Sequence, residues 1–226
     1  MKKYTALLID ADQTLFDFKG AEKQAIHNVL KNAGLPCDED TAELYSRIND
    51  TFWKKLERGE IKREEIYEGR FKELLRQLNS DLSAQEINNN YFEQLPLCST
   101  LYDGAREFLE SLGKEGYKRY MITNGAAPVQ CRRIELCNVG HLFEGIFISE
   151  DVGFAKPDKA YFDMVLEQIE EKDKTKLLVI GDSPSADIAG GKNAGIDTCL
   201  YSPSGISCTP EPDYIVKSYD EIFKII

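Results

Sequence analysis

Two aspartates lie two residues apart at the end of the first apolar segment of the chain. In the stretch LLIDADQTLF, Asp10 and Asp12 follow the apolar run 4–9, and Thr14 comes next. Carboxylates held close together repel unless a hard cation such as Mg²⁺ neutralises them, and a carboxylate can also act as a nucleophile. A second acid at this spacing can protonate a leaving group and later activate water. The stretch therefore predicts a cation-binding pair of acids that could supply a nucleophile and an acid–base group, with the Thr14 hydroxyl satisfying backbone or nucleophile groups in the turn.

Further functional side chains follow later apolar segments of the sequence. They are a hydroxyl, an amide, an ammonium and two more carboxylates, together with one glycine: Thr123, Asn124, Gly125, Lys156, Asp182 and Asp187. In open parallel sheets, sites form at the carboxyl ends of the strands. A single aspartate after a strand often only caps the next helix, but the convergence of all these groups favours one active site. A hydroxyl and a lysine there would bind the oxygens of a phosphoryl group.

The elements that must position these residues fall into two kinds. From about residue 100 onward, strands and helices alternate with short connections, which predicts a parallel sheet covered by helices on both faces. Between about 20 and 95, apolar residues recur at intervals of three and four, which predicts four helices and no strand. The chain is therefore predicted to contain an α/β core, 1–17 and 97–226, interrupted after its first strand by a helical domain, 18–96.

The overall composition argues against several classes of partner. The net charge of −11 argues against binding polymeric nucleic acid or an anionic membrane, although a bound cation would still allow a small anionic substrate. No apolar run approaches a membrane span, and the N-terminal segment is too short for a signal peptide. The six cysteines form no CxxC pair, which favours free thiols in a reducing cytosol and a cytoplasmic location. Because the chain has only two histidines, acid–base chemistry is expected from carboxylates.

Four short motifs are similar, in order, to those of the haloacid dehalogenase-like superfamily. A first motif of the form DxDxT matches Asp10, Asp12 and Thr14, and a threonine at a strand end matches Thr123 in MITNG. A lysine before proline matches Lys156 in AKPD. The fourth motif, GDxxxxD, matches the segment GDSPSAD, whose two acids are Asp182 and Asp187. Each motif is weak alone, but together they cover the core from end to end and are highly specific.

The resemblance implies a Rossmann-like parallel-sheet core with a four-helix α-helical cap domain inserted after the first strand. It also implies Mg²⁺-dependent phosphoryl transfer through an aspartyl phosphate. Asp10 would be the nucleophile and a metal ligand. Asp12 would act as general acid and then as general base, with its backbone carbonyl also on the metal.

The remaining motif residues receive binding roles from the same resemblance. Thr123 and Lys156 would bind the phosphoryl group, with the backbone amides of Asn124 or Gly125 close to it. The carboxylate of Asp182 would hold the metal directly. For Asp187, the resemblance leaves open a direct contact with the metal or one through water or a neighbouring group.

A finer resemblance is to the pyrimidine 5′-nucleotidase branch of the superfamily. It rests on DADQTLFDF, on FWKKLERGEI followed by GRF, on ITNG and on ISEDVGFAKPD. This implies a phosphatase acting on small phosphorylated substrates, namely dUMP, UMP or dTMP, as a monomer or a homodimer. Phosphatases of phosphoglycolate or sugar phosphates share the core motifs and are the alternative.

Three other functions fit the sequence less well. A dehalogenase needs no proton donor for an alkoxide, so Asp12 favours a phosphatase. Phosphomutases often carry Gly–Val after the second acid, where this chain has Gln13, Thr14 and Leu15. A non-catalytic binding protein would be expected to lack one of the catalytic positions, and all of them are present.

The predicted cap contains two features with alternative interpretations. Phe52, Trp53 and Phe71 either fill a small helical core or offer a surface on which a base stacks. The turn Arg58–Gly59–Glu60 is either a plain connection between helices or a loop that sets specificity when the cap closes. In the functional interpretation, Trp53 and Arg58 are the residues that select the substrate.

Overall fold

The computed structural model of the protein describes residues 2–205 and 207–226, and it divides into two compact units. The core unit joins Met1–Asp17 to Leu101–Ile226, and the helical unit is Phe18–Thr100. The sequence predicts the second boundary at 96/97, whereas the structure divides at 100/101 because the last helix of the helical unit continues to Cys98. At the junction, Phe16 pairs with Leu101 in a short antiparallel bridge, so the two parts of the core unit meet there.

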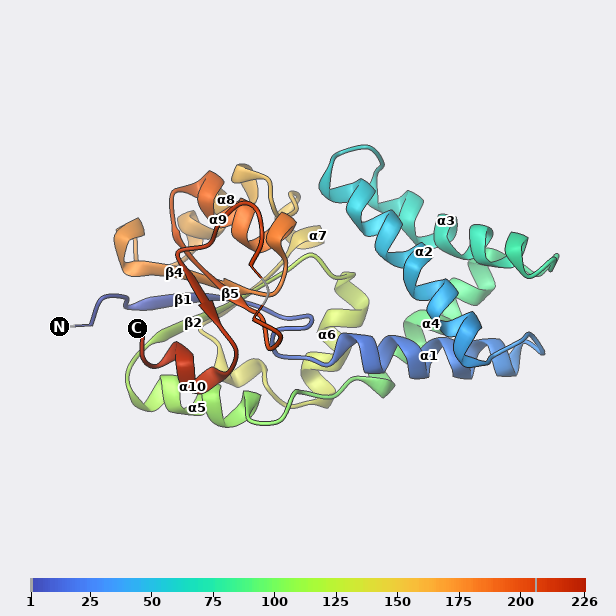
Figure 1. The fold of residues 1–226 in the computed structure, drawn as a ribbon, viewed down its shortest axis with the longest axis horizontal. Coiled ribbons are helices and arrows are strands. Elements are labelled where there is room, and N and C mark those ends of the chain that lie inside the picture. The colour runs from blue at the N-terminus through green and yellow to red at the C-terminus, as the bar shows by residue number, and fades with distance from the viewer. Residues whose placement is uncertain (1, 206) are drawn as a thin grey trace. The chain divides into compact units, whose positions relative to one another are not determined.

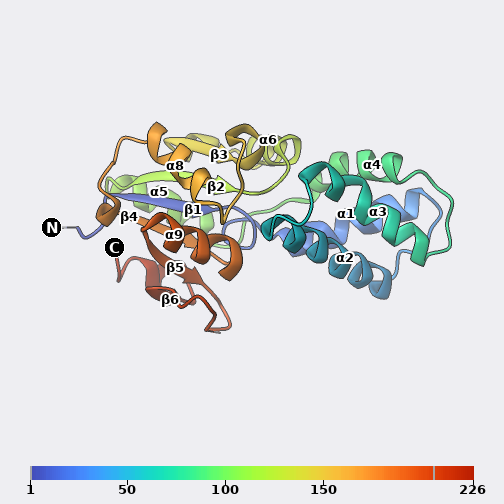
Figure 2. The ribbon, with the colours of Figure 1, turned by 90° about the horizontal axis from the view of Figure 1, so that it is seen from above.

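The core unit is built on one sheet of six strands that all run parallel. Figure 2 labels these strands. The order is β3-β2-β1-β4-β5-β6, so the first strand lies in the middle and the order reverses beside it. In such sheets the ligand site forms at the carboxyl ends of the strands, at the point of reversal. The strands are β1 (Ala6–Asp10), β2 (Lys118–Thr123), β3 (Gly145–Ile148), β4 (Leu177–Gly181), β5 (Asp197–Tyr201) and β6 (Tyr214–Val216).

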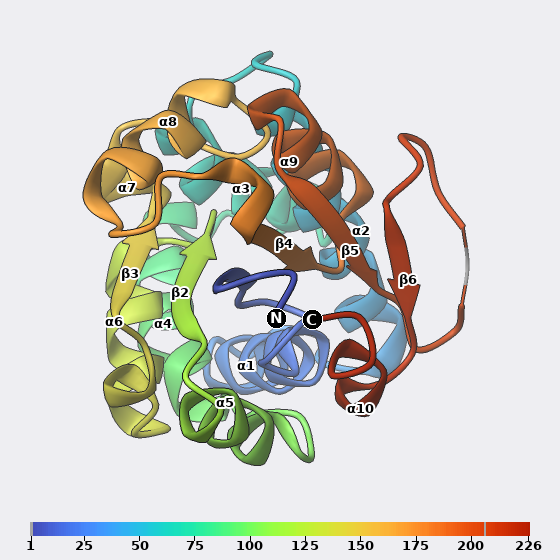
Figure 3. The same ribbon diagram turned by 90° about the vertical axis from the view of Figure 1, so that its left-hand side faces the viewer.

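Helices cover both faces of this sheet, which confirms the predicted fold class (Figure 3). Every residue of β1 is buried, as expected for a strand covered on both faces. The helices of the core unit are α5 (Ala105–Lys114), α6 (Ala127–Leu136), α7 (Ser149–Val152), α8 (Lys159–Gln168), α9 (Ala189–Ala194) and α10 (Tyr219–Ile222). Alternating residues of β1 face opposite layers: Leu7 and Ile9 pack toward α5 and α10, whereas Leu8 packs toward α8 and α9.

Two short helices of the core unit were not predicted. The apolar segment GIFISE is expected to be one strand, but β3 ends at Ile148 and α7 begins at the next residue. Helix α10 follows the last strand, where no periodicity in the sequence is long enough to reveal four residues of helix. Both are single turns, too short for the three- and four-residue spacing that predicts helices.

The helical unit consists of four helices, as predicted (Figure 1). Local signals set their ends, because Asp38 and Ser83 accept hydrogen bonds from backbone amides of the first turns of the second and fourth helices. Aromatic rings fill its interior, where Phe71 stacks on Tyr45 at 5.2 Å between ring centroids. The helices are α1 (Phe18–Asn32), α2 (Glu39–Glu57), α3 (Arg63–Gln77) and α4 (Ala84–Cys98).

Helix α4 extends past the point at which the sequence predicts its end. The sequence predicts that the last of the four helices ends at Leu95, and the next residue, Pro96, has no amide hydrogen. In the structure Leu95 and Pro96 are both buried, and the Ser99 hydroxyl donates to the Leu95 carbonyl at 2.8 Å. Burial of the apolar residues and this cap sustain one more turn.

Two further observations concern the cysteines and the helices of the described residues. None of the six cysteines forms a disulfide among the described residues. Among residues 2–205 and 207–226, we find no helix with the length and apolar character needed to cross a bilayer.

Candidate active site

The turn after β1 places the first two acids at the rim of the sheet. Asp10 is the last residue of the strand and only 6% exposed. The Ala11 carbonyl then accepts hydrogen bonds from the amides of Leu15 and Phe16, both at 2.9 Å, which closes a tight loop. Gln13 takes a positive φ of 59° inside that loop. The backbone therefore turns sharply after Asp10 and carries the side chain of Asp12 to a different set of partners.

Lys156 is the cationic centre of the site. Its side chain is 2% exposed, and its ammonium lies 2.6 Å from Asp10 Oδ1 and 2.6 Å from Asp187 Oδ1. The same nitrogen donates to the Ile122 carbonyl at 3.2 Å, where β2 runs beside Asp10. All three ammonium hydrogens are thus directed at oxygen atoms, so a phosphoryl oxygen would have to share or replace one of these contacts.

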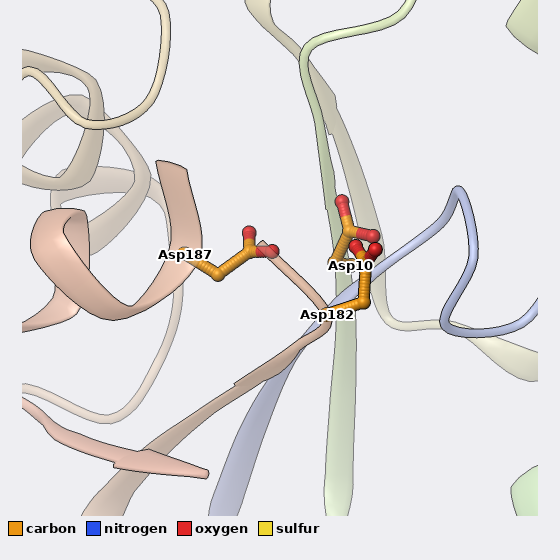
Figure 4. Close-up of side chains that lie close together, drawn as sticks. All are labelled: Asp10, Asp182 and Asp187. Atoms are coloured by element: carbon orange, nitrogen blue, oxygen red, sulfur yellow. The ribbon is translucent and has the colours of Figure 1, made fainter. Parts of the chain in front are cut away.

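Three carboxylates converge at this end of the sheet (Figure 4). Asp10, Asp182 and Asp187 each offer an oxygen within 4.8 Å of the others. Asp182 follows β4 directly, and Asp187 points back toward it from the π-helical turn Pro184–Ile188 before α9. Gly181 is required for this approach, because a Cβ at that position would lie 2.2 Å from Asp187 Oδ2. The Ser183 amide donates to Asp187 Oδ2 at 3.1 Å and fixes the carboxylate.

Burial and mutual repulsion shift the protonation of these groups. Burial, with the nearby Asp187 carboxylate, raises the pKa of Asp10 to about 7, although Lys156 acts in the opposite direction. Burial and the charge of Asp10 likewise raise the pKa of Asp182 well above its usual value. For Lys156, burial alone would lower the pKa, but the two adjacent carboxylates raise it above its ordinary value. The ammonium therefore stays charged, while the acids lack a sufficient counter-charge.

The donor set of this cluster fits a magnesium ion. Three ionised carboxylates around one ammonium leave two negative charges uncompensated, which is the charge of a divalent cation. Asp10 Oδ2 is buried and has no hydrogen-bond partner among the described residues. Hard carboxylate oxygens at this density are the ligands that Mg²⁺ prefers. The carboxylate of Asp12 does not belong to the group, so a metal contact of that residue would have to come from its backbone carbonyl.

Strand β2 ends at Thr123, whose hydroxyl proton can be donated. Thr123 Oγ1 accepts from the Gly125 amide at 3.1 Å and from Gln130 Nε2 at 2.7 Å. Because both lone pairs are occupied, the hydroxyl hydrogen is available to a phosphoryl oxygen. The side chain of Asn124 instead binds the backbone of Lys156, accepting from its amide at 2.9 Å and donating to its carbonyl at 2.8 Å. The Gly125 amide is expected near the phosphate, but in the structure it donates to Thr123 Oγ1 within the same loop.

Two residues of α6 that the sequence did not single out complete the surroundings of Asp12. Gln130 Nε2 lies 3.0 Å from Asp12 Oδ2, and Arg133 Nη1 lies 2.6 Å from Asp12 Oδ1. Their three-residue spacing on a helix was the only available signal. The sequence does not distinguish Arg133 from the adjacent Arg132, which is exposed and pairs with Glu135.

The remaining candidate residues are described by their own contacts. Thr14 Oγ1 is buried without a hydrogen-bond partner among the described residues, so the prediction that it satisfies groups of the turn is wrong. In the helical unit, Trp53 is half-buried with the Arg63 guanidinium 5.5 Å from its ring centroid. Arg58 follows α2 and pairs with Glu60 at 2.5 Å, and Gly59 has a φ of +68°. Phe71, by contrast, belongs to the core of that unit.

The sequence and the fold are similar to those of known proteins. The family model for haloacid dehalogenase-like hydrolases matches residues 4–195. YfnB of Bacillus subtilis, which carries only the family name HAD-hydrolase, is 34% identical, with 100% of this chain and 97% of that protein covered. A crystal structure of YfnB bound to magnesium superimposes with a TM-score of 0.92 over 99% of both chains.

Two similar proteins carry a more specific name. The pyrimidine 5′-nucleotidase PynA of Streptococcus pneumoniae is 34% identical, and the match covers 97% of this chain and 93% of that protein. The pyrimidine 5′-nucleotidase YjjG of Escherichia coli is 29% identical, with 99% of this chain and 98% of that protein covered.

Proposed function

We propose that this chain, which belongs to the haloacid dehalogenase-like hydrolases, is a magnesium-dependent phosphomonoesterase that hydrolyses pyrimidine nucleoside 5′-monophosphates. The observation that carries the proposal is the state of Asp10. One of its oxygens is held by Lys156 at 2.6 Å, and the other is buried without a hydrogen-bond partner in the described part of the chain. A carboxylate with one oxygen fixed and one available suits a nucleophile.

In this proposal, each active-site residue of the core unit has a separate role in the reaction. Asp10 Oδ2 attacks the phosphorus and forms an aspartyl phosphate, while Thr123 donates its hydroxyl hydrogen to a phosphoryl oxygen and Lys156 balances its charge. Asp12 gives a proton to the departing alkoxide and then removes one from the water that hydrolyses the aspartyl phosphate. When bound by the acids, magnesium supplies positive charge that offsets the charge of the phosphoryl oxygens.

The metal ligands in this proposal are the side chains of Asp10 and Asp182, with the backbone carbonyl of Asp12. Asp187 also lies in the acid cluster, but its two oxygens contact Lys156 and the Ser183 amide. We therefore assign Asp187 the role of holding Lys156 and the turn in place. The bound magnesium of the YfnB crystal structure supports the choice of metal.

The choice of a nucleotide as substrate rests on the two similar pyrimidine 5′-nucleotidases. The acids, Thr123 and Lys156 recognise only a phosphoryl group and a cation, so discrimination has to come from other residues. We propose that the helical unit supplies it, with Trp53 and Arg58 as the candidate specificity residues. Phosphoglycolate and sugar phosphates are the competing substrates, because the same core chemistry serves them.

A screen of phosphate release tests the proposal directly. The purified protein is assayed with Mg²⁺ against uridine, deoxyuridine and thymidine 5′-monophosphates, purine nucleotides, phosphoglycolate and sugar phosphates. We expect the highest kcat/KM with a pyrimidine nucleotide. A higher kcat/KM with a purine nucleotide or phosphoglycolate would refute the nucleotidase assignment and leave the phosphatase chemistry standing, whereas no release from any ester would refute both.

A further inference from the structure

We propose that Gln130 and Arg133 on α6 are positioning residues that hold the Asp12 carboxylate and link it to the Thr123 hydroxyl. The inference rests on the proposed acid–base role of Asp12 and adds two residues that the motifs do not contain. Neither residue is one of the acids, the lysine or the threonine that meet the phosphoryl group. They act through Asp12, which both contact, and through Thr123, which Gln130 contacts.

The contacts form one continuous network. The Gln130 amide nitrogen donates to Asp12 Oδ2 at 3.0 Å and to Thr123 Oγ1 at 2.7 Å. Arg133 pairs with the other oxygen of Asp12 at 2.6 Å, and its Nε donates to Gln130 Oε1 at 2.5 Å. One oxygen of Asp12 is therefore hydrogen-bonded from α6, and the other lies in an ion pair with Arg133 without a hydrogen bond among the described residues. Together the two contacts limit rotation of the carboxylate about its side-chain bonds.

The chemistry of the partners fixes the orientation of the Gln130 amide. A guanidinium can only donate and a carboxylate can only accept, so the oxygen of Gln130 must face Arg133 and its nitrogen must face Asp12. The opposite orientation would place two oxygens together and two donors together. Gly125 leaves room for the Gln130 side chain in either orientation, because a Cβ there would lie 2.0 Å from Gln130 Nε2.

The burial of Arg133 argues that this network is more than packing. Both Gln130 and Arg133 are 1% exposed, and the guanidinium lies 4.3 Å from the centre of the Phe16 ring. Arg133 Nη2 has no hydrogen-bond partner among the described residues. A buried ion pair with an unsatisfied donor is a poor source of stability, and apolar residues of similar volume often pack as well or better. The charge is better explained by the orientation of Asp12, whose side chain remains 28% exposed and can meet a substrate.

Leaving-group chemistry distinguishes a positioning role from a purely structural one. In the first step, Asp12 transfers its proton to the oxygen of the departing group as the bond from phosphorus to that oxygen breaks. An alkoxide needs this proton, whereas 4-nitrophenolate departs readily without it. Since kcat/KM reports the steps up to the first irreversible one, misplacement of Asp12 lowers it selectively for alkyl phosphates.

The test compares Gln130→Met and Arg133→Met with the wild-type protein. Each variant is assayed for kcat/KM with 4-nitrophenyl phosphate and with uridine 5′-monophosphate, or with phosphoglycolate if uridine 5′-monophosphate is not hydrolysed. Asp12→Asn is the benchmark for complete loss of the acid. Arg132→Met is the matched control, because Arg132 is 54% exposed and pairs only with Glu135 in the described residues. The melting temperature of each variant verifies folding. Arg133→Lys tests whether a positive charge without the planar, bidentate guanidinium restores activity.

We expect Gln130→Met and Arg133→Met to lower kcat/KM for the alkyl phosphate by about tenfold or more and for the aryl phosphate by less than about threefold. Arg133→Lys should recover only part of the loss, and Arg132→Met should match the wild type. Equal losses on both substrates, or none, would overturn the positioning role. If Arg133→Met fails to fold, Gln130→Met decides the question. If Asp12→Asn itself shows no preference between the substrates, the proposed acid role of Asp12 fails instead.

Discussion

The two oxygens of Asp10 have different surroundings, and this asymmetry defines the chemistry at the scale of single residues. Oδ1 is fixed by Lys156, and Oδ2 is buried without a hydrogen-bond partner among residues 2–205 and 207–226. Lys156 in turn is held by Asp187 and by the side chain of Asn124, which binds its backbone amide and carbonyl. If Asp10 is the nucleophile, as proposed, these contacts orient its attacking atom before substrate arrives.

Replacement of the nucleophile gives the first prediction. Asp10→Asn removes the oxygen that would form the aspartyl phosphate, so kcat should fall by roughly 10³-fold or more while the fold persists. The measurement is phosphate release from 4-nitrophenyl phosphate, with circular dichroism as the check on folding. Activity near that of the wild type, with deamidation of the new asparagine excluded by mass spectrometry, would refute the role of Asp10.

The same residue predicts how the stability of the metal-free protein depends on pH. The pKa of Asp10 is raised from 3.8 to about 7, chiefly by burial. A carboxyl of this kind binds more protons folded than unfolded between these values, so the free energy of unfolding should fall as pH rises through that interval. Asp182 shifts in the same direction.

Urea denaturation in the presence of a chelator measures this dependence. We expect the wild type to lose more stability than Asp10→Asn between about pH 5 and about pH 8, because the variant lacks one of the titrating groups. Added Mg²⁺ should reduce the loss for the wild type, since it neutralises the ionised acids. Parallel curves for the two proteins in chelator would show that Asp10 titrates normally.

At the scale of elements, strand ends were predictable and helix faces were not. The apolar strands β1, β2 and β4 lead to Asp10, Thr123 and Asp182 at the same rim, and the sequence alone predicts that convergence. Helix α6 is predicted too, but not the face on which Gln130 and Arg133 meet Asp12. The contact of Gln130 with Asp12 joins residues 118 positions apart, and no local pattern reports it.

The sequence also does not reveal which polar side chains make contacts within the protein. Asn124 lies in the motif MITNG, and a role near phosphate was a reasonable expectation for its backbone. Its side chain instead joins the loop after β2 to Lys156. Pro96 predicts a helix end, but the burial that carries α4 past it depends on packing with other helices, which no local signal reveals.

The helical unit is the element for which substrate specificity is predicted. Trp53 is half-buried and lies outside the stacked core that Phe71 forms with Tyr45. If its ring stacks on a base, Trp53→Ala should lower kcat/KM for uridine 5′-monophosphate by roughly 5- to 150-fold, the range for a stacking loss of about 1–3 kcal/mol. The value for 4-nitrophenyl phosphate should change much less.

Phe71→Leu provides the matched control for that substitution, because Phe71 is a core residue of the same unit. It should lower the melting temperature and affect both substrates to the same extent. The specificity role of Trp53 would be refuted if Trp53→Ala behaved in this way, with a parallel loss of stability and of activity on both esters.

At the scale of the whole molecule, a strongly acidic protein is proposed to bind a doubly negative substrate. The net charge of −11 repels phosphate esters at long range, and the three converging acids add to that repulsion locally. Lys156 supplies only one positive charge within this cluster. A divalent cation is therefore expected to be a condition for both substrate binding and turnover.

Metal removal tests this expectation on the intact protein. EDTA should abolish phosphate release, and Mg²⁺ should restore it better than Ca²⁺, whose larger and looser coordination suits in-line attack less well. Mg²⁺ should also raise the melting temperature of the wild type, because a ligand that binds only the folded state stabilises it. Full activity in a chelated sample would contradict the proposed metal dependence.

The short bridge between Phe16 and Leu101 has a consequence for how the gene can be rearranged. The two ends of the core unit that flank the insertion are hydrogen-bonded neighbours, so a tight turn of a few residues can join them without disturbing β1 or the sheet. The junction between residues 17 and 101 is therefore a position at which the inserted unit can be removed or replaced. An exchange of the inserted unit at this position should leave the strand that carries Asp10 in register.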